Sequence, residues 1–253
     1  MSAYLTDLRD EKRRSRRMLT RFRDRAHAGT LLAEELADYT GRDEVLVLGL
    51  PRGGVQAAVE VAESLGAPLD VFLVRKMHIS GDEEIAMGTI ARGGVSVINH
   101  SIVEAFCVPQ TTLQETIARQ ATELALREAW YRSGRPALPI ADRCVILVDD
   151  GIATGATMRA AIQSVRAHHP SQVVVAVPVA SSQTCQIIAA EADHFICLLK
   201  LRLLFSVGIW YDRFPTMTDE EVRRSLRIAD ERRMSGSAAL PSIPMMPPTS
   251  MSR

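Results

Sequence analysis

The chain has 253 residues, of which 47% are hydrophobic and 24% charged, and this ordinary balance excludes a collagen-like or wholly disordered protein. Basic and acidic residues both number 30, so no global field attracts nucleic acid or an anionic membrane, and we expect neither as a partner. Only three of the basic residues are lysines, which makes a single surface arginine a weak sign of function.

The cysteines and the N-terminal segment favour a cytoplasmic protein. The four cysteines form no C-x-x-C pair, a pattern typical of free thiols in a reducing compartment, and the histidines show no metal-ligand spacing. The charged N-terminal segment lacks the apolar core of a secretion signal. No apolar run approaches the roughly 18 residues that a membrane span needs.

Both ends of the chain differ from the segment between them. Residues 1–19 predict a basic helical extension. The basic stretch 12–25 is interpreted as a solvated helical face, with a nucleic-acid contact as the alternative. Thr30 is the predicted N-cap of a second helix that reaches residue 39. Residues 235–253 are rich in Pro, Ser and Met without periodicity, which predicts a disordered tail. The domain proper is therefore expected over 20–234.

In chain order, strand and helix patterns alternate through this domain. Short apolar runs bounded by turn residues predict buried strands, and helical apolar spacing predicts the helices that connect them. This alternation predicts an α/β fold with a central parallel sheet flanked by helices. The expected strands are 44–50, 69–74, a pair within 86–98, 144–150, 172–180 and 194–199, and the expected helices are 55–66, 111–132, 157–169 and 184–192.

The segment 145–157 carries the strongest chemical signal. An apolar strand delivers Asp149 and Asp150 at its carboxyl end, the edge at which open α/β sheets bind ligands. A turn of small residues then opens a helix, so that backbone N–H groups and threonine hydroxyls converge on a phosphate. Carboxylates accept hydrogen bonds from ribose hydroxyls, directly or through Mg²⁺. A plain strand end with helix-capping threonines is the alternative interpretation.

This segment resembles the 5-phosphoribosyl 1-pyrophosphate (PRPP) motif of the type I phosphoribosyltransferases. The resemblance implies that fold, with a central parallel sheet flanked by helices, a small hood and a long inserted helix. It implies that Asp149 and Asp150 hold the ribose hydroxyls. The loop expected to hold the 5′-phosphate comprises Gly151, Ile152, Ala153, Thr154, Gly155, Ala156 and Thr157.

A second segment of the same family type follows the first strand at 50–54, Leu-Pro-Arg-Gly-Gly. The resemblance implies that this loop binds pyrophosphate through the backbone amides of Gly53 and Gly54, with Arg52 beside them. Alone, such a sequence is equally typical of an ordinary turn. Together with the acidic pair at a later strand end, it indicates a shared site.

Two further basic residues, Arg75 and Lys76, end the second predicted strand. The resemblance implies that they face the pyrophosphate and that residues 78–84 belong to a loop that covers the site and excludes water. Two solvated charges after a strand are the alternative.

The end of the domain, 203–214, contains the predicted base contacts. In relatives that use hypoxanthine or guanine, an aromatic residue before a Val-Gly pair stacks on the base and a later acid meets the metal, and Phe205 and Asp212 match that spacing. Trp210 is a rival stacking surface, and packing in the core is the alternative for both aromatic residues. The closer subgroup places the acid one position later, where this chain has Arg213.

The resemblance implies a Mg²⁺-dependent phosphoribosyltransferase, with Arg52 and Lys76 stabilising the leaving group and Asp149, Asp150 and Asp212 as metal contacts. Its partners would be PRPP and a nucleobase-like molecule that the sequence does not identify, because selectivity lies in the hood, here 20–40 and 200–214. Some purine-specific relatives carry an acid where this chain has Ala153. A non-catalytic PRPP or nucleotide-binding regulator is the alternative, followed by an interaction scaffold. Homodimers are common for the fold.

Overall fold

A computed structural model describes residues 21–79 and 82–237 of the chain. The predicted helical extension, 1–19, lies outside these residues. So does the predicted tail from 238 onward, whereas 235–237 form the end of a helix.

The centre of the molecule is a five-stranded parallel sheet. The strand order is β2-β1-β6-β7-β8, and neighbouring strands pair in parallel. Every residue of β1 and β6 is buried, as expected for strands covered on both faces. The predicted α/β fold is therefore confirmed, with the strands β1 (Val45–Gly49), β2 (Leu69–Val71), β6 (Cys144–Val148), β7 (Gln172–Ser181) and β8 (His194–Leu201).

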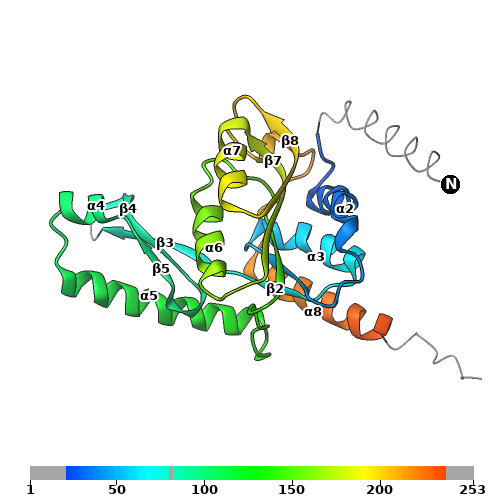
Figure 1. Cartoon of the computed structure of the whole chain (residues 1–253), viewed down its shortest axis with the longest axis horizontal. Helices are drawn as coiled ribbons and strands as arrows, with labels where there is room; N and C mark the ends of the chain where they lie inside the picture. Colours follow the sequence, from blue (N-terminus) through cyan, green and yellow to red (C-terminus); the bar gives the residue numbers. More distant parts are fainter. Residues whose placement is uncertain (1–20, 80–81, 238–253) are drawn as a thin grey trace, which may run out of the picture.

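Helices cover the two faces of this sheet (Figure 1). Alternate residues of a strand point to opposite faces, so Val45 and Val47 pack in one apolar cluster with helices α2, α3 and α8, while Leu46 and Leu48 pack in another with α6 and α7. No helix within the described residues is both long enough and apolar enough to cross a membrane. The bounds are α2 (Arg25–Glu35), α3 (Gly53–Leu65), α6 (Ala156–Arg166), α7 (Ser182–Glu191) and α8 (Asp219–Ser237), with short 3-10 turns η1 (Ala37–Tyr39) and η3 (Gly208–Trp210).

An arm projects from one side of the sheet (Figure 1). It consists of the antiparallel strands β3 (Val74–Ile79), β4 (Asp82–Ala91) and β5 (Ser96–Ile98), the turn η2 (Arg92–Gly94) and the helices α4 (His100–Ala105) and α5 (Gln110–Tyr131). Of the predicted covering loop 78–84, residues 78–79 end β3 and residues 82–84 begin β4, whereas 80–81 lie outside the described residues. The polar residues of this segment hid the strand pattern, because backbone pairing between β3 and β4, rather than apolar alternation, defines the strands here.

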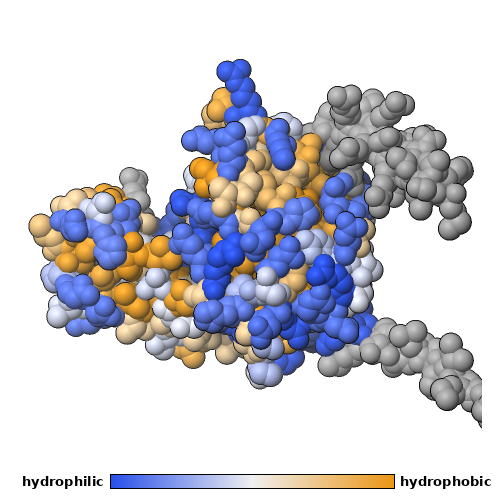
Figure 2. Space-filling view, in the orientation of Figure 1, coloured by the Kyte–Doolittle hydropathy of each residue, from blue (hydrophilic) through white to orange (hydrophobic). Residues whose placement is uncertain are grey.

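The arm leaves part of its apolar surface uncovered. Figure 2 shows apolar side chains on its surface, and three large hydrophobic residues, Phe106 directly after α4 and Leu126 and Trp130 of α5, are at least 42% exposed. Only part of the apolar surface of α5 therefore lies against the remainder of the described chain.

Helix α2 begins earlier than predicted. Asp24 is its N-cap and accepts a hydrogen bond from the His27 amide, at 3.0 Å. The predicted cap, Thr30, lies inside the helix, where its hydroxyl donates to the Ala26 carbonyl. A carboxylate is a strong N-cap acceptor. The helix therefore begins more than one turn before the predicted start at Thr30.

The predicted hood segments, 20–40 and 200–214, lie side by side. Phe22 pairs with Tyr211 in an isolated β-bridge, and the Phe22 amide donates to the Trp210 carbonyl at 2.8 Å. The buried residues Phe22, Ala28, Val179 and Tyr211 form a third apolar cluster there. This cluster fixes the hood on the sheet beside β7.

A buried ion network fastens the end of α5 to β2. Arg132 donates through Nε to both oxygens of Asp70, at 2.8 and 3.0 Å, and through its other nitrogens to Glu128 at 3.2 Å. All three side chains are at most 6% exposed. Because breaking one member leaves buried charges without partners, this network holds the helix in one position.

Replacing Arg132 by Met should lower the free energy of unfolding by about 3 kcal/mol, since the buried carboxylates of Asp70 and Glu128 lose their nearest cation and Arg92, 3.6 Å from Asp70, compensates only in part. Urea denaturation followed by circular dichroism measures the change. Arg119→Met, an exposed position on the same helix, is the control and should change stability by about 0.5 kcal/mol or less. Equal effects at the two positions would show that the network does not fasten the helix.

Candidate functional site

The two predicted acids lie at the carboxyl edge of the central sheet. Asp149 and Asp150 directly follow β6, and the loop behind them leads into α6 at Ala156. Gly155 adopts a left-handed conformation, with φ of 83°, which residues with side chains rarely adopt. The loop therefore turns back over the strand end and aims the start of α6 at the same edge.

This loop encloses a small cavity of about 160 Å³. Helix α6 has no side-chain cap bond, so the helix-capping interpretation of the threonines is wrong. Thr154 and Thr157 are exposed, and their hydroxyls have no partner among the described residues. An uncapped helix start with free hydroxyls suits a phosphate. The cavity is lined by Asp149, Gly151, Ile152, Ala153, Thr154, Gly155, Ala156, Thr157 and Met158.

The Leu-Pro-Arg-Gly-Gly loop packs directly against the acidic pair. A Cβ atom on Gly53 would lie 1.8 Å from Oδ2 of Asp150, and one on Gly54 would lie 2.8 Å from Cα of Asp149. At Gly54 the atoms in the way belong to the backbone of the strand end, so a side chain there is excluded, whereas a side chain at Gly53 would have to displace the carboxylate of Asp150. The glycines therefore bring the two predicted ligand loops into one site.

Burial acts strongly on the two carboxyl groups. It raises the pKa of Asp149 well above its ordinary range, and the adjacent charge of Asp150 raises it further. Burial also raises the pKa of Asp150, although the hydrogen bond from Arg25 opposes that shift. Two neighbouring acids in this environment gain from any ligand that donates hydrogen bonds or positive charge.

Arg25 is a site residue that sequence reasoning missed. Its Nε donates to Oδ2 of Asp150 at 2.6 Å, and its Nη1 donates to the Pro215 carbonyl at 2.7 Å. The guanidinium lies 3.7 Å from the centre of the Phe214 ring, and the side chain is only 5% exposed. It therefore neutralises one acid and leaves Asp149 without a cationic partner. In a chain so rich in arginine, nothing distinguished this residue beforehand.

Tyr211 joins the hood to the acidic pair. Its hydroxyl donates to the backbone carbonyl of Asp150 at 2.6 Å. Its ring lies between those of Phe22 and Phe214, with centroids 5.3 and 4.8 Å away. The hood therefore supports the acidic pair through Tyr211 and Arg25 together.

The three residues predicted near the base are separated. Phe205 is 87% exposed on the loop after β8, whereas Trp210 is partly buried in the hood cluster, the packing alternative named above. Asp212 is 57% exposed and pairs with Arg21 at 3.4 Å. The structure thus brings none of them into contact with the acidic pair, and base stacking stays a prediction.

The predicted cations also take different positions. Arg75 and Lys76 are consecutive strand residues and so point to opposite faces of β3. Arg75 faces α5 and pairs with Glu123 at 2.5 Å, whereas Lys76 is exposed. Arg52 is 46% exposed and lies 4.0 Å from Asp219, at the start of α8. Of the three predicted cations, Arg52 and Arg75 line a common pocket and Lys76 does not.

For a metal ion, the site offers the oxygens of Asp149 and Asp150. No group of three or more potential ligands gathers anywhere in residues 21–79 and 82–237, so Asp212 adds no third ligand. Carboxylate oxygens suit Mg²⁺, which commonly takes one or two of them and completes its shell with water and substrate phosphates. The donor set therefore fits a magnesium ion that arrives with a phosphorylated ligand.

A family model described as phosphoribosyl transferase domain matches residues 17–197. Two curated proteins from Mycobacterium tuberculosis strains, provisionally named phosphoribosyl transferases, are each 43% identical over 201 residues, which cover 79% of this chain and 45% of theirs. The chain thus spans about half their length. A crystal structure of a protein from Thermus thermophilus is 45% identical with a TM-score of 0.70, covering 81% of this chain and 97% of that one.

Replacing Asp149 by Asn should change how stability depends on pH. Because the folded-state pKa of Asp149 is raised, the folded state holds a proton that the unfolded state releases above about pH 4, so stability falls with rising pH by up to about 1.4 kcal/mol for each unit until the folded pKa is passed. Asp149→Asn should remove the contribution of Asp149 to this decline, leave that of Asp150, whose pKa burial also raises, and be at least as stable as the natural protein at pH 7.

Urea unfolding between pH 4 and 8, in buffer with a chelator, measures this difference. Asp142→Asn, at an exposed position outside the site, is the control and should preserve the decline. An Asp149→Asn curve parallel to that of the natural protein would contradict the raised pKa.

Proposed function

The chain belongs to the phosphoribosyl transferase domain family, and we propose that it transfers the 5-phosphoribosyl group of PRPP to a nitrogen of a nucleobase or related small molecule, with release of pyrophosphate. One observation carries this proposal. The acidic pair lies directly between the phosphate-sized cavity of residues 151–157 and the glycines of the Leu-Pro-Arg-Gly-Gly loop.

The three parts of PRPP correspond to these three features. The 5′-phosphate would occupy the cavity at the start of α6, where backbone amides and the hydroxyls of Thr154 and Thr157 donate to it. The ribose hydroxyls would donate to the carboxylates of Asp149 and Asp150. The pyrophosphate would then lie toward the uncapped start of α3, at Gly53.

Bound with PRPP, Mg²⁺ would be held by Asp149 and Asp150 and would supply positive charge beside the pyrophosphate oxygens. The protein's own groups act in the same direction. Arg52 and the amides of Gly53 and Gly54 would stabilise the charge that builds on the leaving group, in positions set before the reaction begins.

In the transfer, the nitrogen lone pair of the acceptor forms a bond to C1 of the ribose while the bond from C1 to the pyrophosphate oxygen breaks. The electron pair of that bond leaves with the pyrophosphate. The proton of the attacking nitrogen passes to solvent, because Ala153 stands where some relatives carry an acid. Catalysis therefore rests on positioning and electrostatic stabilisation.

Replacing both Asp149 and Asp150 by Asn should weaken PRPP binding about 100-fold, since two charge-assisted hydrogen bonds of about 1.5 kcal/mol or more are lost. Isothermal titration calorimetry with PRPP and Mg²⁺ measures the affinity. Asp142→Asn again provides the control for surface charge. Unchanged affinity in the double variant would remove the acids from the ribose site.

Pyrophosphate release from PRPP, assayed across a panel of purine and pyrimidine bases, tests the reaction itself. We expect one base class to give release that depends on PRPP, Mg²⁺ and base together. Tight PRPP binding without release for any base would instead favour the non-catalytic regulator. Absence of PRPP binding would leave only the scaffold function.

A further inference from the structure

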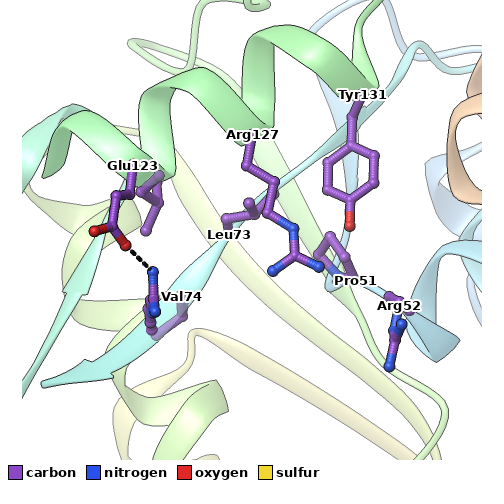
Figure 3. Close-up of a pocket in the computed structure, with 9 residues that line it drawn as sticks. Pro51, Arg52, Leu73, Val74, Glu123, Arg127 and Tyr131 are labelled. Carbon is purple, nitrogen blue, oxygen red and sulfur yellow. Dashed lines mark hydrogen bonds and ion pairs between the residues drawn. The ribbon is translucent and has the colours of Figure 1, made fainter. Parts of the chain in front are cut away.

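A second pocket, of about 410 Å³, lies beside the Leu-Pro-Arg-Gly-Gly loop (Figure 3). It opens between that loop, the start of β3 and the last turns of α5. Three arginines from three different elements converge on it, while apolar residues form its floor. The lining comprises Pro51, Arg52, Leu73, Val74, Arg75, Glu123, Leu124, Arg127 and Tyr131.

Two residues that line this pocket, Arg127 and Tyr131, already bind an anion of the protein. Arg127 donates through Nη2 to both carboxylate oxygens of Asp219, at 2.8 and 2.9 Å, and the Tyr131 hydroxyl donates to Oδ1 at 2.6 Å. Arg52 approaches the same oxygen to 4.0 Å. Figure 3 shows Arg127 and Tyr131 directed from α5 toward the loop that carries Pro51 and Arg52. The geometry is that of a site for a doubly charged oxyanion group.

The electrostatics agree with this geometry. The hydrogen bonds from Tyr131 and Arg127 lower the pKa of Asp219, so the carboxylate is charged at neutral pH. Burial, with a contribution from Asp219, raises the pKa of Tyr131 to about 12, so the phenol keeps the proton that it donates.

Helix α8 does not need the Asp219 side chain as a cap. Thr218 and Glu221 cap it reciprocally: the Thr218 amide and hydroxyl donate to Oε2 of Glu221, and the Glu221 amide donates back to the Thr218 hydroxyl. The carboxylate of Asp219 is therefore available to bind arginine or to leave it.

The contact is also easily exchanged. The side chains of Arg127 and Asp219 are 50% and 40% exposed, and exposed ion pairs contribute little to stability. Arg75, at the other end of the pocket, is likewise paired with an exposed acid, Glu123. Ligand phosphates carry more charge and more acceptor oxygens than either carboxylate.

We propose that Arg127 and Tyr131 of α5, together with Arg52, form a diphosphate-binding site that the carboxylate of Asp219 occupies until a ligand displaces it. The proposal rests on the proposed function in one respect, that the diphosphate is the leaving group of PRPP. Asp219 is then an internal competitor that lowers the affinity for pyrophosphate and so favours its release after the reaction.

The test uses the full chain and inorganic pyrophosphate, titrated calorimetrically at fixed ionic strength. Asp219→Asn should bind pyrophosphate about tenfold more tightly, and Arg127→Gln about tenfold more weakly, because each change alters one charged contact at the site. Tyr131→Phe should weaken binding to a smaller extent. In the double variant Arg127→Gln/Asp219→Asn, the gain from Asp219→Asn should largely disappear.

Two matched controls separate this competition from a general change in charge. Glu220→Gln removes the adjacent acid, which is 71% exposed, and Arg119→Gln removes an exposed arginine of the same helix; both should leave the affinity unchanged. Thermal unfolding of each variant verifies folding. If Asp219→Asn folds and binds pyrophosphate no more tightly than Glu220→Gln does, the competition is refuted.

The result of this pyrophosphate test can be distinguished from the result of the PRPP-binding test of the proposed function. Loss of PRPP binding on replacement of Asp149 and Asp150, with no effect at Asp219, would refute this inference alone. Tighter pyrophosphate binding in Asp219→Asn, in a protein that binds no PRPP, would support the site and refute the proposed function.

Discussion

The close approach of two loops, one after β1 and one after β6, is the constraint on which the site depends. Gly53 and Gly54 lie against the acidic pair with no room for a Cβ atom. The Leu50 amide also donates to the Val148 carbonyl, at 2.9 Å, so the strand ends themselves are joined. Because both loops follow neighbouring strands at one sheet edge, a ligand longer than a single phosphate can contact both of them.

That approach places two acids where burial disfavours their charge, and the hood compensates for only one of them. Arg25 neutralises Asp150, and Tyr211 holds the Asp150 carbonyl. Within the described part of the chain, Asp149 accepts one hydrogen bond, from the Asp150 amide at 2.8 Å. The folded state therefore disfavours the charged form of Asp149. A ligand with hydroxyl donors or a cation would stabilise that charged form, so that binding and stability are coupled at this position.

The sequence predicted the parallel sheet and the two ligand loops because these depend on local signals: apolar runs, glycines and adjacent acids. It did not predict Arg25, Arg127 or Asp219, since their roles arise from contacts across long stretches of chain, 125 residues between Arg25 and Asp150. Helix α8 was missed for a related reason, because it is strongly polar and packs on α3 with only a few residues. Because arginine is so frequent in this chain, the sequence offered no way to identify which arginines have these roles.

The buried network of α5 explains how an exposed arginine can have a defined position. Glu128 and Arg132 face the core and fasten the helix to Asp70. Arg127 and Tyr131 each precede one of these residues, and consecutive helical residues point about 100° apart. One face of the last turns of α5 therefore anchors the helix through the buried network, and the adjacent face carries Arg127 and Tyr131 into the pocket.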